Sequence, residues 1–600
     1  MAIEALPATP PWLEIVRGNA PLLLFAPHGS RAGAAAAAVL HPKVNDLETA
    51  AITRELAQRL EATALVNSGM DRNELDCNRL SQVAQREPWL LETIAREVSR
   101  ITARHGRITI LLIHGWNIIE PRVDLGLGLK ERTGRLYPTR GAHVSADDQF
   151  IEQTAHALAA RLRRFGIVPT FGLRYPGGDE QNLLQIFTPR HAISENRAVR
   201  QLAALAASGA INAMQLELSV AVRLAGAPRQ HLIDAIVTTF GLPLEHRPPV
   251  TSDPPRVARD HVAKPSRKTP SASPDLPPFR IGVEFYDPAL GLGGMASFDF
   301  GPNASGGRIM MLFERRRVAL FTGEGGALRI GDSVALGPLT LDGSDGRSGL
   351  RFRGPAVVVD DGTAYLSVEG ALASGRLDPM MEVDTVLEFA DGGPRFGDVL
   401  DRLEAHIARL GEHSATGAIV SPPSMPHPSF GRMRGMVSFE GERRGLEALA
   451  RVGVSFTGLG VRKFAQRRML WACATGTQPC DAVELSALEF DQAPTYSSAG
   501  VLRRGTWQQA ELTAFALEAA SPLAPPDIIA ASIRHPPGLI ALEGTPDTFM
   551  TLSRPGPDST RIHTSLGFAR YRINGHDAAG MYEYSRRAGT TAPADVDPED

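Results

Sequence analysis

The sequence predicts a protein in two parts, an α/β domain with a largely parallel sheet followed by an all-β half. Up to about residue 243, short apolar runs alternate with segments of helical periodicity, which is typical of a three-layer α/β domain. Beyond residue 278, apolar and polar residues alternate in short segments that are separated by Gly, Asp and Asn. Several such strands at short intervals predict antiparallel sandwiches or barrels.

Four segments are expected along the chain. At 600 residues the chain exceeds a single core, because domains usually span roughly 100–200 residues. Residues 244–278 are rich in Pro, Ser and charge without an apolar period, which predicts a linker that buries too little surface to fold. The stretch "GEHSATGAIVSPPSMPHPSFG" marks a second, weaker break. The predicted segments are an α/β domain at 15–243, the linker at 244–278, a β domain at 279–410 and a second β domain at 430–590.

Composition and charge indicate which kinds of binding partner and which cellular compartment to expect. The formal net charge of -3 gives no reason to expect a nucleic-acid partner or a charged membrane surface. Three cysteines, Cys77, Cys473 and Cys480, are too few for a disulfide framework and favour a reducing compartment. The apolar run "PLLLFA" is too short for a signal peptide or a membrane span. We therefore expect a cytoplasmic protein with no membrane span.

Two predicted strands of the α/β domain end in a histidine. "PLLLFAPHG" and "RITILLIHGW" are short apolar runs with His28 and His114 at their carboxyl ends. Helical spacing of apolar residues marks "DLETAAITRELAQRLEA", "PWLLETIAREVSRITARHG" and "DDQFIEQTAHALAARLRRFG", and "AMQLELSVAVRLAG" is a strand that leads into a helix. Open α/β sheets bind ligands at the carboxyl ends of their strands, which is where these histidines lie.

The polar residues at these strand ends match the needs of a catalytic zinc site. Two histidines and one carboxylate, from Asp46 or Glu48 in "HPKVNDLET", leave a fourth position for water. A carboxylate that is not a ligand then serves as general base, and Glu217 is a candidate because a charged residue in a helix-covered strand needs a partner or a purpose. Each residue alone also has a plain reading, as a structural hydrogen-bonder or a helix first-turn acid.

Two arginines are candidates for stabilising the oxyanion and for binding a substrate carboxylate. Arg72 and Arg79 lie in "RNELDCNR" together with Asn78. One arginine aimed at the carbonyl would stabilise the developing oxyanion, and a second would bind a substrate carboxylate through its bidentate fork. The combination of histidines, carboxylates and arginines favours hydrolysis of an amide bond.

Residues 15–240 resemble the N-formylglutamate amidohydrolases, zinc deformylases related to the carboxypeptidase-like metallohydrolases. The resemblance is carried by His–Gly after two strands, an Asp at the start of the first helix, "RNELDCNR" and "QLELS". It implies a phosphorylase/hydrolase-like fold and one Zn2+ per chain. The implied site residues are His28, Asp46 and His114 as metal ligands, Arg72 on the carbonyl, Asn78 and Arg79 on the substrate carboxylate, and Glu217 as general base. No acid follows closely after His28 in "HGSRAG", so the ligand must come from "NDLET", with Glu48 as the alternative to Asp46.

The β half more faintly resembles double lipocalin-like proteins of the AttH type, which are related to carotenoid hydratases. "GRMRGMVSF", "VGVSFTGLGVRKFAQRRMLWA" and "GMYEYSRR" carry this resemblance, which would cover residues 279–590 as two β domains or two halves of one. It implies a fold that holds an apolar, lipid-like or isoprenoid-like ligand between its halves. The family's Asp–His–Ser–Trp–Gly segment appears as "SFTGLGVRKF" and lacks the Asp and His, so a binding or scaffolding module is expected.

Two functions follow from these expectations. The first is a zinc-dependent amidohydrolase that cleaves the linear C–N amide bond of a small N-acyl or N-formyl amino-acid-like substrate with a free carboxylate. The alternative is a binding protein without catalysis, in which the β half captures an apolar metabolite. Stoichiometric metal in the purified chain distinguishes the two, because only the enzyme needs it. A third possibility joins them, in which the amidohydrolase acts on an acylated or lipid-like compound that the β half presents.

Overall fold

The structure of the chain is a computed structural model. It describes residues 10–30, 43–132, 134–241, 279–300, 306–324, 328–330, 333–344, 347–366, 368–389, 428–456, 464–476, 481–490, 496–519, 521, 524–536, 538–555 and 560–588. These residues form two compact units, one drawn from residues 1–117 and 121–264 and the other from residues 118–120 and 265–600. The predicted linker at 244–278 lies outside the described residues.

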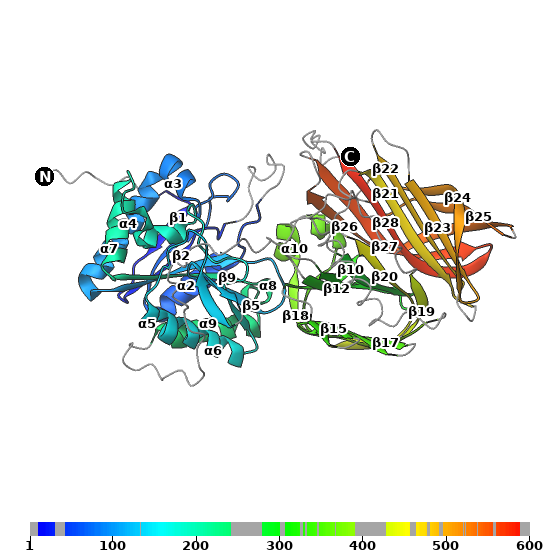
Figure 1. The fold of residues 1–600 in the computed structure, drawn as a ribbon, viewed down its shortest axis with the longest axis horizontal. Helices are drawn as coiled ribbons and strands as arrows, with labels where there is room; N and C mark the ends of the chain where they lie inside the picture. Colours follow the sequence, from blue (N-terminus) through cyan, green and yellow to red (C-terminus); the bar gives the residue numbers. More distant parts are fainter. Residues whose placement is uncertain are drawn as a thin grey trace, which may run out of the picture. The chain divides into compact units, whose positions relative to one another are not determined.

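A seven-stranded sheet forms the centre of the first unit, in the order β1-β3-β2-β4-β9-β5-β8 (Figure 1). Its strands are β1 (Leu13–Val16), β2 (Leu22–Ala26), β3 (Thr63–Asn67), β4 (Ile108–Gly115), β5 (Arg122–Gly126), β8 (Val168–Phe171) and β9 (Ile211–Leu218). The pairs β2–β3, β2–β4, β4–β9 and β5–β8 are parallel, whereas β1–β3 and β5–β9 are antiparallel. The prediction of a largely parallel sheet is confirmed.

Helices cover both faces of this sheet. They are α2 (Thr49–Leu60), α3 (Leu80–Arg86), α4 (Pro88–His105), α5 (Asp148–Phe150), the π-helical η1 (Ile151–Ala155), α6 (His156–Arg164), the 3-10 turns η2 (Leu183–Phe187) and η3 (Pro189–His191), α7 (Arg197–Ala207), α8 (Val220–Arg223) and α9 (Ala227–Phe240). A separate hairpin pairs β6 (Leu129–Arg132) with β7 (Arg135–Pro138).

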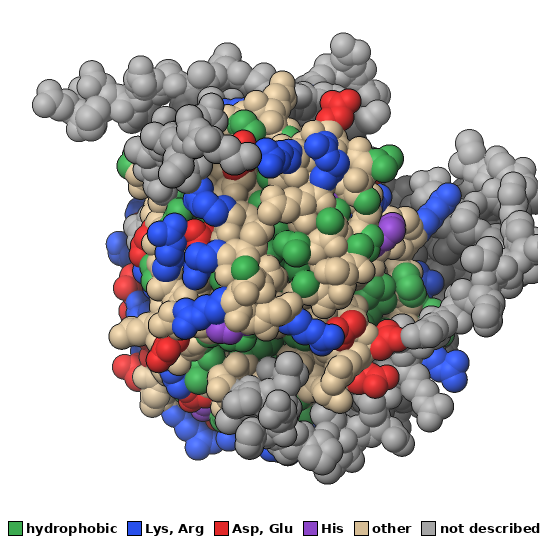
Figure 2. All heavy atoms as spheres, turned by 90° about the vertical axis from the view of Figure 1, so that its left-hand side faces the viewer, with side chains coloured by type: hydrophobic (Ala, Val, Ile, Leu, Met, Phe, Trp, Pro, Cys, Tyr) green, Lys and Arg blue, Asp and Glu red, His purple; other side chains and the backbone are tan. Residues whose placement is uncertain are grey.

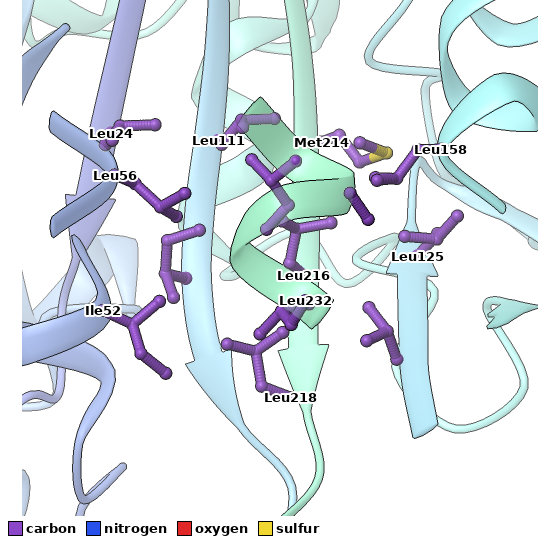
Figure 3. Close-up of a cluster of buried hydrophobic side chains, with 14 of the residues drawn as sticks. Leu24, Ile52, Leu56, Leu111, Leu125, Leu158, Met214, Leu216, Leu218 and Leu232 are labelled. Atoms are coloured by element: carbon purple, nitrogen blue, oxygen red, sulfur yellow. The ribbon is translucent and has the colours of Figure 1, made fainter. Parts of the chain in front are cut away.

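Each face of the sheet has its own apolar core, because successive strand residues point to opposite faces. Leu22 and Leu24 of β2 belong to a cluster that includes α2, α6 and α9. Leu23 and Phe25 belong to a second cluster, which includes α3, α4 and α7. Figure 3 shows part of the first cluster, in which side chains of the strands face those of the helices. The three layers predicted from the sequence are therefore present.

Among its described residues the second unit has many strands and two short helical segments, so the predicted all-β half is confirmed. Its elements are β10 (Phe279–Asp287), β11 (Leu292–Phe300), β12 (Gly306–Phe313), β13 (Arg317–Glu324), β14 (Leu328–Ile330), β15 (Ser333–Leu336), β16 (Leu339–Ser344), β17 (Arg347–Val359), η5 (Gly362–Leu366), α10 (Val368–Ser374), β18 (Arg376–Phe389), β19 (Ser429–Phe439), β20 (Glu442–Phe456), β21 (Phe464–Ala474), β22 (Ala482–Phe490), β23 (Tyr496–Arg503), β24 (Thr506–Glu518), β25 (Ile528–His535), β26 (Gly538–Pro555), β27 (Arg561–Ile573) and β28 (His576–Ala588).

These strands close into two antiparallel barrels, the arrangement expected of a lipocalin-like half. The first barrel has the strand order β13-β12-β11-β10-β20-β19-β18-β17 and closes where β13 pairs with β17. Strands β14 to β16 continue its sheet beyond β17. The second barrel consists of β21 to β28 in chain order. Each barrel therefore has eight strands and no open sheet edge within its closed ring.

The boundary between the two barrels lies further along the chain than the sequence suggested. The Pro-rich break predicted a first β domain that ends at residue 410 and a second that begins at residue 430. However, β19 pairs with β18, and β20 pairs with β10, so both strands belong to the first barrel. The second barrel begins with β21 at Phe464. In sequence, the Pro-rich stretch therefore lies between two strands of the same barrel and does not separate two domains.

Among the described residues, no helix combines the length and the apolar character that crossing a bilayer requires. On the face drawn in Figure 2, basic, acidic and apolar side chains lie intermixed.

Candidate metal centre

Two histidines and an aspartate meet at the carboxyl edge of the first unit's sheet. His28 follows β2 and His114 lies near the end of β4, and both side chains are buried. Oδ2 of Asp46 lies 3.2 Å from Nδ1 of His28 and 3.3 Å from Nδ1 of His114. One potential ligand atom from each residue lies within 4.8 Å of the other two. The structure thus brings together the three residues predicted as metal ligands.

The donor set of this cluster fits a divalent metal ion. Two imidazoles and one carboxylate are typical of catalytic zinc sites, which keep a further position for water or substrate. Nε2 of His114 is buried and has no hydrogen-bond partner among the described residues. Burial lowers the pKa of His114, which favours the neutral form of the imidazole, the form that binds metals.

Asp46, and not Glu48, is the carboxylate beside the histidines. The backbone N–H of Asp46 donates to the carbonyl of His28 at 2.8 Å, which draws the start of α2 against the end of β2. Burial alone would raise the pKa of Asp46, but hydrogen bonds from the two histidines hold it well below its usual range. Glu48 is the N-cap of α2 with a φ of 71°, and its carboxylate pairs with Arg229 at 2.9 Å. Glu48 is therefore engaged elsewhere.

Asp76 orients His28 and was given no role from the sequence. Its Oδ1 lies 2.8 Å from Nε2 of His28, and its Oδ2 accepts a hydrogen bond from Nζ of Lys43 at 2.6 Å. A carboxylate on the second ring nitrogen of a metal-binding histidine fixes the tautomer and the orientation of the ring. The segment "LDCNRL" contains Asp76, but the sequence does not show that this acid faces His28.

Arg72 lies beside the cluster, on the loop that follows β3. Its guanidinium is 3.7 Å from Oδ1 of Asp46 and 3.5 Å from Oδ2 of Asp76. The loop is held in place because the backbone N–H of Arg72 donates to Oδ1 of Asn45 at 3.0 Å. The side chain of Arg72 is 27% exposed, so part of it is accessible to a substrate. This position suits the predicted role on a carbonyl oxygen.

Asn78 and Arg79 contact the segment 179–183. The backbone N–H of Leu183 donates to Oδ1 of Asn78 at 3.3 Å, and Nη1 of Arg79 pairs with Asp179 at 3.2 Å. Among the described hydrogen bonds and ion pairs, neither Asn78 nor Arg79 contacts the three metal-ligand candidates. The predicted carboxylate clamp is therefore an exposed arginine that already has an internal carboxylate as its partner.

Glu217 is buried in β9, in the row of the sheet that also contains His114 on β4 and Asp124 on β5. Its Oε1 accepts a hydrogen bond from Nε2 of Gln215 at 2.6 Å. Burial, together with the negative charges of Asp46 and Asp124, raises the pKa of Glu217 well above its usual value. A carboxylate with a raised pKa holds a proton more readily, which suits a general base.

Arg223 connects the two segments that carry the ligand candidates, and nothing in the sequence singled it out. It is buried at the end of α8, where Nη1 donates to the carbonyl of Leu47 at 2.8 Å and Nη2 to the carbonyl of Trp116 at 3.2 Å. These residues follow Asp46 and Gly115 in the chain. A Cβ at Gly115 would lie 2.7 Å from Nη1 of Arg223 and 3.0 Å from Cβ of Asp46, so a side chain there would displace the guanidinium of Arg223.

No family model and no curated protein matches the sequence. Solved structures with a similar fold cover the two parts of the chain separately. A putative AttH from Nitrosomonas europaea is 12% identical with a TM-score of 0.31, and covers 54% of this chain and 98% of its own. Kievitone hydratase from Nectria haematococca is 8% identical with a TM-score of 0.31, and covers 52% of this chain and 89% of its own.

A third similar structure is N-formylglutamate amidohydrolase from Ralstonia eutropha. It is 13% identical with a TM-score of 0.25, and covers 39% of this chain and 97% of its own. Both families that the sequence resembles are therefore found among structurally similar proteins.

Proposed function

We propose that the first unit is a zinc-dependent amidohydrolase that cleaves the C–N bond of a small N-acyl or N-formyl amino acid. The observation that supports this most is the buried cluster of His28, Asp46 and His114, whose potential ligand atoms lie within 4.8 Å of one another. A second carboxylate, Glu217, lies in the same row of the sheet as His114 and is not one of these ligands. A buried cluster of this kind with a separate base matches the needs of metal-assisted amide hydrolysis.

Each step of the hydrolysis has a residue of this chain to perform it. When bound, Zn2+ would lower the pKa of a coordinated water to about 7 and polarise the carbonyl oxygen of the amide. Glu217 takes a proton from the attacking water as the C–O bond forms, and later gives it to the nitrogen as the C–N bond breaks. Arg72 donates hydrogen bonds to the carbonyl oxygen while negative charge develops there. Asp76 holds His28 in the orientation needed for binding.

The substrate carboxylate is assigned to Arg79, which must release Asp179 to bind it. The side chains of Arg79 and Asp179 are 46% and 64% exposed, and such surface pairs contribute only about 0.2–1 kcal/mol. This is roughly a fivefold effect at most, so a substrate that is held elsewhere in the site can displace Asp179. The internal pair therefore keeps the guanidinium in place between turnovers without blocking it.

Arg79→Ala is expected to raise KM about tenfold or more for N-acyl amino acids with a free carboxylate, because a charged hydrogen bond is worth about 1.5–3 kcal/mol. The corresponding amides, which lack the charge, should be hydrolysed by wild type and variant with similar KM. Asp179→Asn serves as the matched variant and should lower KM slightly for the carboxylates. Equal losses for carboxylates and amides in steady-state kinetics would show that Arg79 does not bind the carboxylate.

The proposed function is tested by the metal content and the activity of the full-length chain. We expect about one zinc per chain by elemental analysis. The zinc-loaded protein should release free amine from members of a panel of N-formyl and N-acyl L-amino acids, and a chelator should abolish the release. A chain that binds no zinc even after zinc is added would contradict this function and favour an apolar-ligand-binding protein.

A further inference from the structure

A chain of hydrogen bonds leads from the backbone to the proposed general base. Gln215 precedes Glu217 by two residues on β9, and both side chains are buried. Nε2 of Gln215 donates to Oε1 of Glu217 at 2.6 Å, and Oε1 of Gln215 accepts from Nδ2 of Asn182 at 3.2 Å. Oδ1 of Asn182 accepts from the backbone N–H of Leu184 at 2.8 Å, which also caps η2.

The backbone N–H of Leu184, at the start of this series of hydrogen bonds, fixes which group donates and which accepts in each of them. A backbone amide can only donate, so the oxygen of Asn182 faces Leu184 and its NH2 group faces Gln215. Gln215 must then present its oxygen to Asn182 and its NH2 group to Glu217. As a result, Oε1 of Glu217 receives a hydrogen bond and Oε2 is the oxygen left to accept a proton.

We infer that Gln215, held by Asn182, is a positioning residue that orients Glu217 so that Oε2 is the proton-accepting atom in the amide hydrolysis. This inference rests on the proposed function. The carboxyl group of Glu217 has no ion-pair partner among the described residues that would hold it instead. The orientation of a buried base matters because a displacement of about 1 Å can cost about 100-fold in rate.

The same hydrogen-bond chain also reaches the carboxylate clamp. Asn182 forms an antiparallel backbone bridge with Arg79, and the backbone N–H of Leu80 donates to the carbonyl of Gln181 at 2.8 Å. The segment 179–183 is therefore bonded to the clamp through its backbone and to the base through the side chain of Asn182. Binding of the substrate carboxylate and orientation of the base are thus linked through one segment.

Two variants remove or reverse the hydrogen bond to Glu217. Gln215→Met keeps the length of the side chain but cannot donate, so we expect kcat to fall about 10–100-fold with KM within about twofold of the wild-type value. Asn182→Asp keeps the acceptor for Leu184 but replaces the donor to Gln215. Gln215 must then turn its NH2 group toward the introduced carboxylate and its oxygen toward Glu217, which should lower kcat by a similar factor.

Asn212→Leu is the matched control. Asn212 lies at the other end of β9, and its amide bonds to Asp147 at 3.2 Å and not to Glu217. We expect this variant to keep the kcat of the wild-type protein. Zinc content and the midpoint of thermal unfolding are measured for every variant, because a purely structural role of Gln215 would change these quantities and leave kcat per zinc unchanged.

A readout that does not depend on activity tests the hydrogen-bond chain itself. Hydrogen–deuterium exchange of the peptide around residues 179–185 should be faster in Gln215→Met than in the wild-type protein, because this variant removes the side-chain partner of Asn182. Asn182→Asp should exchange at about the wild-type rate, because residue 182 still accepts from Leu184 and now accepts from Gln215. Unchanged exchange in Gln215→Met would overturn the proposed series of hydrogen bonds, whatever the activity.

The positioning role and the proposed function fail in different ways. A normal kcat in Gln215→Met, in a chain that hydrolyses N-acyl amino acids, overturns the positioning role while the proposed function stands. Absence of turnover in the wild-type protein with every member of the substrate panel overturns the proposed function and the positioning role with it. A fall in kcat with unchanged KM and zinc content supports both.

Discussion

Glu217→Gln is expected to lower kcat for hydrolysis of an N-acyl amino acid by about 10²–10⁴-fold, the range that a positioned acid–base group contributes. The substitution keeps the shape of the side chain but removes its ability to accept a proton. Because Glu217 is not among the ligand candidates, the zinc content should remain at the wild-type value. Steady-state kinetics and elemental analysis on the same preparation measure both quantities.

Glu97→Gln is the control for this prediction. Glu97 is also buried in the first unit, but it pairs with Arg17 and Arg100 at 2.8 Å and lies outside the candidate site. Its replacement should lower stability and leave kcat unchanged. If Glu217→Gln retains the kcat of the wild-type protein, another group accepts the proton and the assignment of the base is wrong.

His114→Ala is expected to abolish stoichiometric zinc binding, and with it turnover above background. The imidazole is one of three donors, and a catalytic site that loses one of them no longer holds the ion firmly at neutral pH. The double variant His28→Ala/His114→Ala should bind no zinc at all. Zinc per chain after dialysis is the measurement.

A buried histidine elsewhere in the same unit provides the comparison. His156 on α6 packs against Phe171, with ring centroids 4.9 Å apart, and lies outside the ligand cluster. His156→Ala should keep about one zinc per chain even where it costs stability. Unchanged zinc in the His114 variant would mean that the ligand set differs from the cluster described above.

Most of the fold could be predicted from the sequence, because its two halves differ in hydrophobic period. Apolar runs ending at His28 and His114 became parallel strands of one sheet, and alternating segments beyond residue 278 became barrels. The domain boundary was misplaced because a Pro-rich stretch looks the same within a barrel as between domains. The pairings of β19 with β18 and of β20 with β10 show that the barrel continues past it.

The candidate site was predictable where a residue follows a strand directly, and less so in loops. The sequence left Asp46 and Glu48 as alternatives, because two acids two positions apart at a helix start look alike. The structure distinguishes them because the backbone at Glu48 is left-handed and its carboxylate pairs with Arg229, which comes from a helix far away in the sequence. Asp76 could not be assigned for the same reason, since its contact with His28 is made by the fold of a loop.

The return of β19 and β20 to the first barrel decides where this chain can be divided. A fragment that ends at residue 410 would lack both strands and would expose the edges of β10 and β18, and unpaired edges of this kind promote aggregation. A fragment that ends after Phe456 keeps the full ring of backbone hydrogen bonds. A cut between Phe456 and Phe464, and not at the Pro-rich stretch, therefore leaves both rings of backbone hydrogen bonds whole. The same cut would expose a buried apolar cluster to which both barrels contribute, with Phe430 from the first and Trp471 and Phe568 from the second, so the two barrels are expected to be stable only when expressed together.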